Sequence, residues 1–189
     1  MQNTTEMLTA QNNPDGTLEC GCPKHFPDWD NKDIDLGGSA MLELPIATFL
    51  HMPMGYEVYL GRVRHLITQL ELEPLWPGFT MTKTGWMRGH ILCPLKSGDS
   101  PSRHVTHLPS PFQLRGKLHK GDIGSIKSSV REMQSELLDA GRMPKELYLS
   151  YLTCPNCQEQ RGGAMILLTR RWQQSSRLGK QINKQTNKD

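Results

Sequence analysis

The chain has 189 residues, of which 36% are hydrophobic and 22% charged, and its formal net charge is +3. This length fits one domain or a duplicated pair of half-domains, and the composition is that of a folded chain. The longest apolar runs fall far short of the roughly 20 residues that cross a bilayer, so we expect no membrane partner. The first 13 residues lack the basic and apolar regions of a secretory signal, which predicts a cytoplasmic protein.

Charge is distributed unevenly along the chain. Residues 1–40 hold two lysines against seven acidic residues, and residues 170–189 hold six basic residues against one acidic residue. The polar stretch 173–189 contains no aromatic residue and is typical of a solvated terminus, so we do not expect nucleic acid as a partner. The chain therefore divides into an acidic N-terminal arm (1–40), a folded domain (41–172) and a basic disordered tail (173–189).

The arm carries the motif Cys20-Gly21-Cys22. Two thiolates at this spacing supply half of a tetrahedral metal site, and His25 lies close enough in sequence to replace one of them. The surrounding segment, 11–38, has few apolar residues and little reason to fold by itself. The arm is therefore predicted to be held to the rest of the chain by a metal ion.

The first half of the folded domain reads as strand, helix, strand, strand. A strand is predicted over 44–52, and a helix follows because apolar residues recur at helical spacing between 54 and 72. Two strands, 79–86 and 90–95, form a hairpin that turns near 88–89. The stretch 96–111, rich in serine, glycine and proline, is predicted to be a linker.

The second half repeats this pattern. A strand over 112–119 precedes a helix between 121 and 140, and strands follow over 146–153 and 164–172. The apolar residues of the two helices match at an offset of 67, as do Pro77 and Pro144. We therefore predict an α+β fold of two tandem βαββ half-domains, about 41–95 and 112–172, with an antiparallel sheet, a pseudo-twofold axis and a metal-stapled arm.

Two tandem βαββ units with one long helix each resemble the gyrase-inhibitor-like, or SOUL effector-binding, superfamily. The resemblance covers roughly residues 44–172 and rests on topology and repeat register. It implies a groove between the halves that binds small apolar or cationic molecules. Members of the superfamily regulate transcription, bind haem or hydrolyse small adducts, and the acidic, cysteine-containing arm departs from their pattern.

The connection between the last two strands contains Cys154-Pro155-Asn156-Cys157, 134 positions after the first cysteine of the arm. Together with Cys20 and Cys22, this pair can place four thiolates about 2.3 Å from a Zn²⁺ ion in a closed structural site. The alternatives are an iron–sulfur cluster on the same thiolates, a redox-active dithiol at Cys154 and Cys157, or inert thiols. The odd count of five cysteines argues against a disulfide framework.

Six further residues are candidates for a ligand-binding groove. Aromatic residues are concentrated in the first half, and a histidine ends the first strand of each half. The candidates are Tyr56, Tyr59, Trp76, Trp86, His51 and His119. Core packing would account for most of the aromatic residues without any ligand.

These features predict a small-molecule-binding or sensory protein with a structural four-cysteine zinc site. One alternative is an enzyme, either a thiol–disulfide oxidoreductase or a small hydrolase that uses the groove. Another is a macromolecular interaction or adaptor protein with a protein partner, acting through the arm and the tail. No catalytic residue is assigned, because the sequence contains no G-x-S-x-G, Walker loop, H-E-x-x-H or dinucleotide fingerprint.

Overall fold

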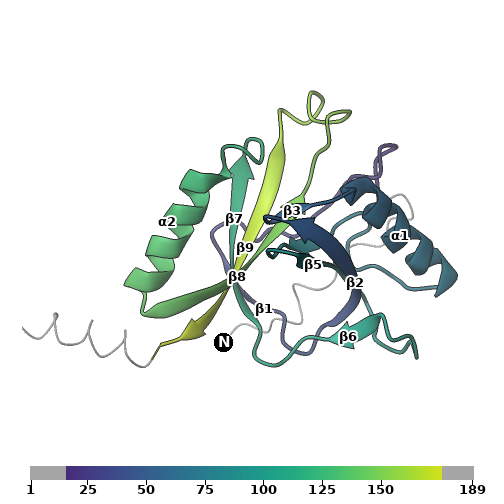
Figure 1. Cartoon of the computed structure of the whole chain (residues 1–189), viewed down its shortest axis with the longest axis horizontal. Helices are drawn as coiled ribbons and strands as arrows, with labels where there is room; N and C mark the ends of the chain where they lie inside the picture. Colours follow the sequence, from purple (N-terminus) through teal and green to yellow (C-terminus); the bar gives the residue numbers. More distant parts are fainter. Residues whose placement is uncertain (1–15, 176–189) are drawn as a thin grey trace, which may run out of the picture.

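The structure, a computed structural model, describes residues 16–175, which form two helices and a nine-stranded antiparallel sheet (Figure 1). The predicted α+β class is confirmed. The helices are α1 (Tyr56–Gln69) and α2 (Ile126–Asp139). The strands are β1 (Asp33–Asp35), β2 (Ala40–Phe49), β3 (Met52–Pro53), β4 (Met81–Lys83), β5 (Arg88–Pro94), β6 (Val105–His107), β7 (Gln113–Lys120), β8 (Arg142–Tyr151) and β9 (Met165–Gln174). Nearly all of the predicted disordered tail lies outside the described residues.

The two βαββ halves join into one sheet at its centre. The strand order is β1-β7-β9-β8-β4-β5-β2-β3, and β6 pairs with β2. β4 and β8, each the first strand after a helix, pair through Thr82 with Leu149 and Lys83 with Tyr148. Each half therefore contributes an equivalent run of three strands, related by a pseudo-twofold axis between β4 and β8.

The repeat of the two helices is present, but its register differs from the predicted offset of 67. Both helices have 14 residues and their starts are 70 positions apart. A slip of three residues keeps a side chain on nearly the same helical face, so the apolar pattern fits both offsets. The structure decides between them, because Val63 and Met133 are both buried, whereas Ile123 precedes α2 and is exposed.

Some predicted boundaries also move. β5 begins at Arg88, so the hairpin turn lies between β4 and β5 over 84–87 and not near 88–89. The predicted linker contains a short strand, β6, that pairs with the start of β2. Within residues 16–175, neither helix is long and apolar enough to cross a membrane.

Neighbouring residues of the central strands face opposite layers of the core. Leu42 and Ile91 pack beneath α1, while Met41 and Leu92 face the other side of the sheet. The strand register places Ile91, Thr82, Leu149 and Leu168 side by side, and the last two pack beneath α2. Both helices therefore cover the same face of the sheet.

The N-terminal arm covers the opposite face. Trp29 and Leu36 are buried there, and Trp29 makes edge-to-face contacts with Trp76 and Phe79 at ring-centroid distances of 5.4 and 5.8 Å. β1 extends the sheet by pairing with β7. The arm therefore contributes core residues of its own, beyond any stabilisation by a metal ion.

The acidic residues of the arm hold it to the second half. Asp30 accepts a hydrogen bond from the backbone amide of Leu118 at 2.8 Å, and Asp35 accepts one from Phe112 at 2.9 Å. Asp33 pairs with the Arg142 guanidinium at 2.8 Å. The negative charge predicted for the arm thus serves internal contacts at these three positions.

Candidate metal centre

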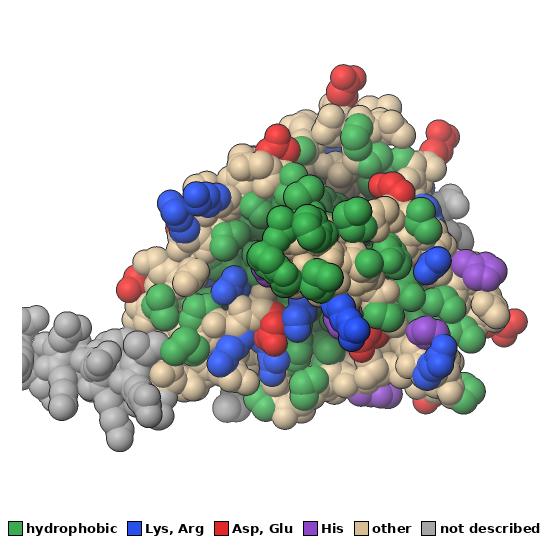
Figure 2. Space-filling view, viewed as in Figure 1, with side chains coloured by type: hydrophobic (Ala, Val, Ile, Leu, Met, Phe, Trp, Pro, Cys, Tyr) green, Lys and Arg blue, Asp and Glu red, His purple; other side chains and the backbone are tan. Residues whose placement is uncertain are grey.

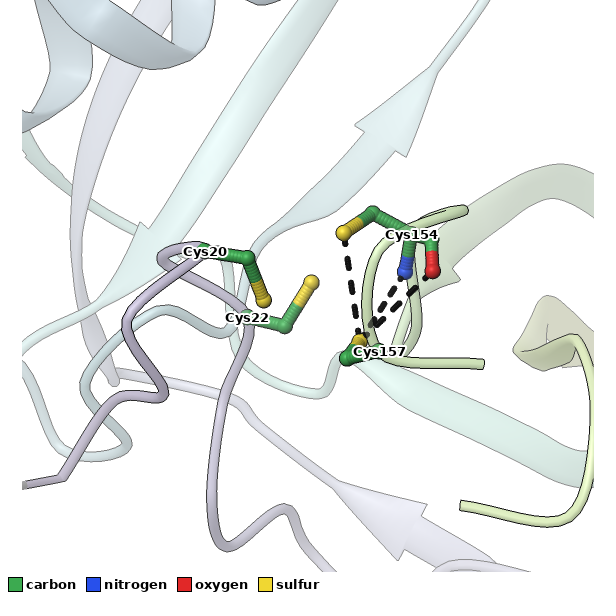
Figure 3. A group of neighbouring side chains, drawn as sticks. All are labelled: Cys20, Cys22, Cys154 and Cys157. Atoms are coloured by element: carbon green, nitrogen blue, oxygen red, sulfur yellow. Dashed lines mark hydrogen bonds between the residues drawn. The ribbon is translucent and has the colours of Figure 1, made fainter. Parts of the chain in front are cut away.

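The sulfur atoms of Cys20, Cys22, Cys154 and Cys157 all lie within 4.8 Å of one another. Figure 3 shows the first pair on a turn of the arm and the second on the β8–β9 connection, with side chains directed toward a shared centre. The Cys154 and Cys157 sulfurs are 3.9 Å apart, far beyond the roughly 2.05 Å of a disulfide bond. Such a group of free thiols can bind a metal ion, and the predicted meeting of the two cysteine pairs is confirmed.

The arm presents its two cysteines on a tight turn. Leu18 donates a backbone hydrogen bond to the carbonyl of Cys22 and accepts one from Gly21, both at 2.8 Å. Gly21 has a φ of +83°, a conformation that residues with a side chain rarely adopt. Gly78, from the segment before β4, packs against this turn so closely that a Cβ there would lie 2.9 Å from the Gly21 oxygen.

The second pair lies on a turn that follows β8. The Cys154 carbonyl accepts hydrogen bonds from the amides of Cys157 and Gln158 at 3.1 and 3.0 Å. The Cys154 amide donates to the Cys157 sulfur at 3.3 Å. This folded turn brings the two thiols together on one side of the connection and fixes their direction.

The four thiols differ in how readily they lose a proton. A backbone hydrogen bond with Cys22 lowers the pKa of Cys20 to about 7. Burial raises the pKa of Cys22 and of Cys157, and neighbouring thiols raise the pKa of Cys22 further. At neutral pH a bound cation must therefore displace protons from at least these last two thiols.

Metal uptake should accordingly weaken as the pH falls. Each proton displaced by the ion should reduce the apparent affinity by about tenfold for every unit that the pH is lowered. Competition titrations against a chromophoric chelator at pH 6, 7 and 8, corrected for the protonation of the chelator, measure this slope. An affinity that does not change with pH would contradict ligation by thiolates.

A cavity of about 260 Å³ adjoins the cysteine cluster, and Cys20, Cys22 and Cys154 form part of its wall. Tyr56 and Tyr151 line it as well, with their ring centroids 5.5 Å apart. The Tyr56 hydroxyl lies 2.7 Å from the hydroxyl of buried Thr82, at the centre of the sheet. Other lining residues include Glu57, Arg64, Thr80 and Thr153.

The six predicted groove residues do not come together. Tyr56 lines the cavity, while Tyr59 accepts a hydrogen bond from the Ala47 amide at 3.1 Å and Trp76 is buried in the core. His119 is buried, with its two ring nitrogens 2.9 and 3.0 Å from the hydroxyls of Ser129 and Ser125. The ligand-binding role of these residues remains a prediction.

The other two predicted groove residues lie on an exposed apolar surface. Hydrophobic side chains gather at the centre of the face in Figure 2, where Figure 1 places β3. The rings of His51 and Trp86 are 6.4 Å apart, and the Leu50 amide donates to the Trp86 carbonyl at 3.0 Å. The exposed apolar residues of this region are Phe49, Leu50, Met52, Met54, Val58, Trp86 and Met87.

Arg161 joins the arm to the β8–β9 connection, and sequence reasoning did not single it out. Its Nη1 donates to the Pro23 carbonyl at 2.7 Å and to the Leu152 carbonyl at 3.3 Å. The guanidinium also lies 5.7 Å from the centre of the Phe26 ring. No local sequence pattern predicts such a residue. Both of its acceptors are backbone carbonyls, and neither belongs to a recognisable motif.

Replacing Arg161 by alanine should loosen the arm and reduce the free energy of unfolding by about 1.5–3 kcal/mol, the typical contribution of a hydrogen bond that involves a charged group. Denaturant unfolding and limited proteolysis between residues 16 and 31 measure these effects. Arg131→Ala, at an exposed position of α2, is the matched control. Equal stability of the two variants would show that the Arg161 contacts contribute nothing.

Solved structures share this fold at low sequence identity. The crystal structure of the EcmrR C-terminal domain matches with a TM-score of 0.56 and 11% identity, over 75% of this chain and 96% of that chain. The cryo-EM structure of an EcmrR–DNA complex matches with a TM-score of 0.51 and 9% identity, over 75% of this chain and 56% of that chain. A search of curated proteins finds no match.

These matches support the predicted resemblance in part and correct one prediction. The chain shares its fold with the EcmrR domain, but neither match names the gyrase-inhibitor-like or SOUL superfamily. The expectation that nucleic acid is not a partner is contradicted by the second match, because EcmrR, which contains this fold, is in complex with DNA in that structure. A family model described as "Bacterial hydrolase" matches residues 11–171, most of the sequence, and the chain therefore belongs to this bacterial hydrolase family.

Proposed function

We propose that this protein is a sensory or regulatory domain that binds a small molecule and carries a structural zinc ion on Cys20, Cys22, Cys154 and Cys157. The convergence of four sulfurs from two segments far apart in the sequence is the observation that carries the proposal. A cytoplasmic setting agrees with five free cysteines, because reducing compartments keep thiols unpaired.

The sulfur spacing supports a single tetrahedral ion. Four thiolates about 2.3 Å from one Zn²⁺ lie about 3.8 Å from each other, close to the 3.9 Å between Cys154 and Cys157. An iron–sulfur cluster places several iron and sulfide atoms between its thiolates and needs a wider arrangement. With four cysteine ligands no coordination position stays open, so the ion would have a structural role.

Elemental analysis and an absorption spectrum of protein purified without added metal test the metal assignment. We expect one zinc per chain and no visible band. A visible charge-transfer band would assign iron instead. Absence of any metal, with all four thiols titrating freely, would refute the metal centre. The redox-active dithiol at Cys154 and Cys157 would then be the favoured alternative.

The cavity beside the metal centre supports the ligand-binding part of the proposal. Its two tyrosine rings offer flat, polarizable contact surface, and its glutamate and arginine offer polar groups that orient a ligand. Shifts in melting temperature across a library of small aromatic molecules, compared between the parent protein and Tyr151→Ala, test it. No stabilising compound, or equal shifts in both proteins, would oppose this use of the cavity.

A hydrolase is the second candidate, favoured by the family match over residues 11–171. Burial raises the pKa of Tyr56, so its phenol stays protonated at neutral pH and can donate a hydrogen bond to a reacting oxygen. Glu57 is the carboxylate that lines the cavity. Hydrolysis of an ester panel that is lost in Glu57→Gln but kept in Glu71→Gln would support an enzyme, and equal rates in both would exclude a role for Glu57.

A further inference from the structure

Arg64 lies on α1, a segment of the fold that contributes none of the four cysteines. Its guanidinium is in contact with the Cys20-Gly21-Cys22 turn, because a Cβ on Gly21 would collide with Arg64 Nη1. Arg64 also lines the cavity whose wall includes three of the four cysteines. A glycine between the two cysteines is therefore needed for this approach as well as for its positive φ.

The charges around the cluster are unbalanced once a metal ion is bound. A divalent cation with four thiolates has a formal charge of −2, and Glu57 adds a further carboxylate to the same cavity. Arg64 is the one cationic side chain among the residues that line this cavity. Within residues 16–175, no carboxylate lies within ion-pair distance of Arg64, so its charge is not used by another partner.

We propose that Arg64 is the counter-charge of the metal centre, a positioning residue that stabilises the negatively charged metal-bound cluster and holds the Cys20-Gly21-Cys22 turn against α1. This inference rests on the metal centre proposed above. Arg64 is itself exposed, whereas Cys20, Cys22 and Cys154 are half-buried, so water screens the attraction between the guanidinium and the thiolates only in part. Groups that surround metal ligands in this way typically change metal affinity by about 10–100-fold.

The test compares zinc affinity in Arg64→Gln, Arg64→Lys and the parent protein by competition with a chromophoric chelator. We expect Arg64→Gln to bind zinc about tenfold more weakly. Arg64→Lys should recover part of the loss, because it keeps the charge. Arg62→Gln is the matched control. Arg62 lies two positions before Arg64 on the same helix, and its guanidinium stacks over the Tyr59 ring at 5.5 Å from the ring centre.

Two further measurements separate a charge effect from a packing effect. The zinc affinity of Arg64→Gln should depend less on salt concentration than that of the parent, and its pH of half-release should be higher. Equal affinity, salt dependence and pH of release in Arg64→Gln and the parent would overturn the role of Arg64. A parent protein that takes up no zinc would instead refute the metal centre itself.

Discussion

Replacing Cys154 by serine should abolish stable metal binding and lower the melting temperature by on the order of 10 °C. A serine hydroxyl does not ionise at neutral pH and is a poor ligand for zinc, so the remaining three thiolates leave one position to water. At a free zinc concentration about a thousandfold above the dissociation constant, binding stabilises the folded state by about 4 kcal/mol. In a domain of this size about 1 kcal/mol corresponds to 2–4 °C.

The measurement is differential scanning calorimetry of the parent and the variant, each with zinc and with a chelator. Chelation should lower the melting temperature of the parent to near that of Cys154→Ser and leave the variant unchanged. Cys93→Ala is the control, because Cys93 is fully buried outside the cluster and burial raises its pKa to about 12. A Cys154→Ser protein that still holds one zinc with parent affinity would contradict the four-cysteine site.

The cysteine spacing was enough to predict that the two pairs meet. A Cys-x-Cys pair and a Cys-x-x-Cys pair each supply two thiolates, half of the ligands of a tetrahedral site. The two pairs are 134 positions apart in the sequence, but the folded sheet brings their two turns together. Arg64 and Arg161 could not be predicted, because a guanidinium that contacts a distant turn or a backbone carbonyl leaves no spacing pattern in the sequence.

The fold was predictable where side-chain period and secondary structure agree. The alternation of apolar residues in the strands and their helical repeat predicted the two βαββ halves, because both patterns indicate which side of an element faces the core. The helix register was wrong by three residues for the same reason, since positions three apart share a face. The short strands β1 and β6 were missed, because three residues carry too little pattern to distinguish a strand from a loop.

The arm shows where composition misleads. Residues 11–38 contain few apolar side chains, and this predicted a segment with little reason to fold by itself, held to the rest of the chain by a metal ion. Yet Trp29 is 4% exposed and sits in a cluster of aromatic rings with Trp76 and Phe79. One large aromatic side chain buries about 150–250 Å², more than a typical aliphatic side chain, so a count of residues understates the contribution of the arm.

The arm should therefore remain partly docked when the metal is removed, and Trp29→Ala should reduce the stability of the metal-free protein as well as that of the metal-bound protein. We expect this substitution to reduce the free energy of unfolding by about 3–5 kcal/mol, the usual range for a large aromatic residue truncated in a core. Trp86→Ala is the matched control, because Trp86 is 62% exposed and its loss should change stability little. Urea unfolding followed by circular dichroism measures both, since the signal does not depend on the tryptophan removed.

Metal and aromatic core should act on the same docking step. In the double variant Trp29→Ala with Cys154→Ser, the loss of stability should be smaller than the sum of the two single losses, because either change alone already weakens the attachment of the arm. Strict additivity would mean that the arm responds to the two contacts independently. Equal effects of Trp29→Ala and Trp86→Ala would show that the aromatic cluster does not anchor the arm, and the metal ion would then be its principal attachment.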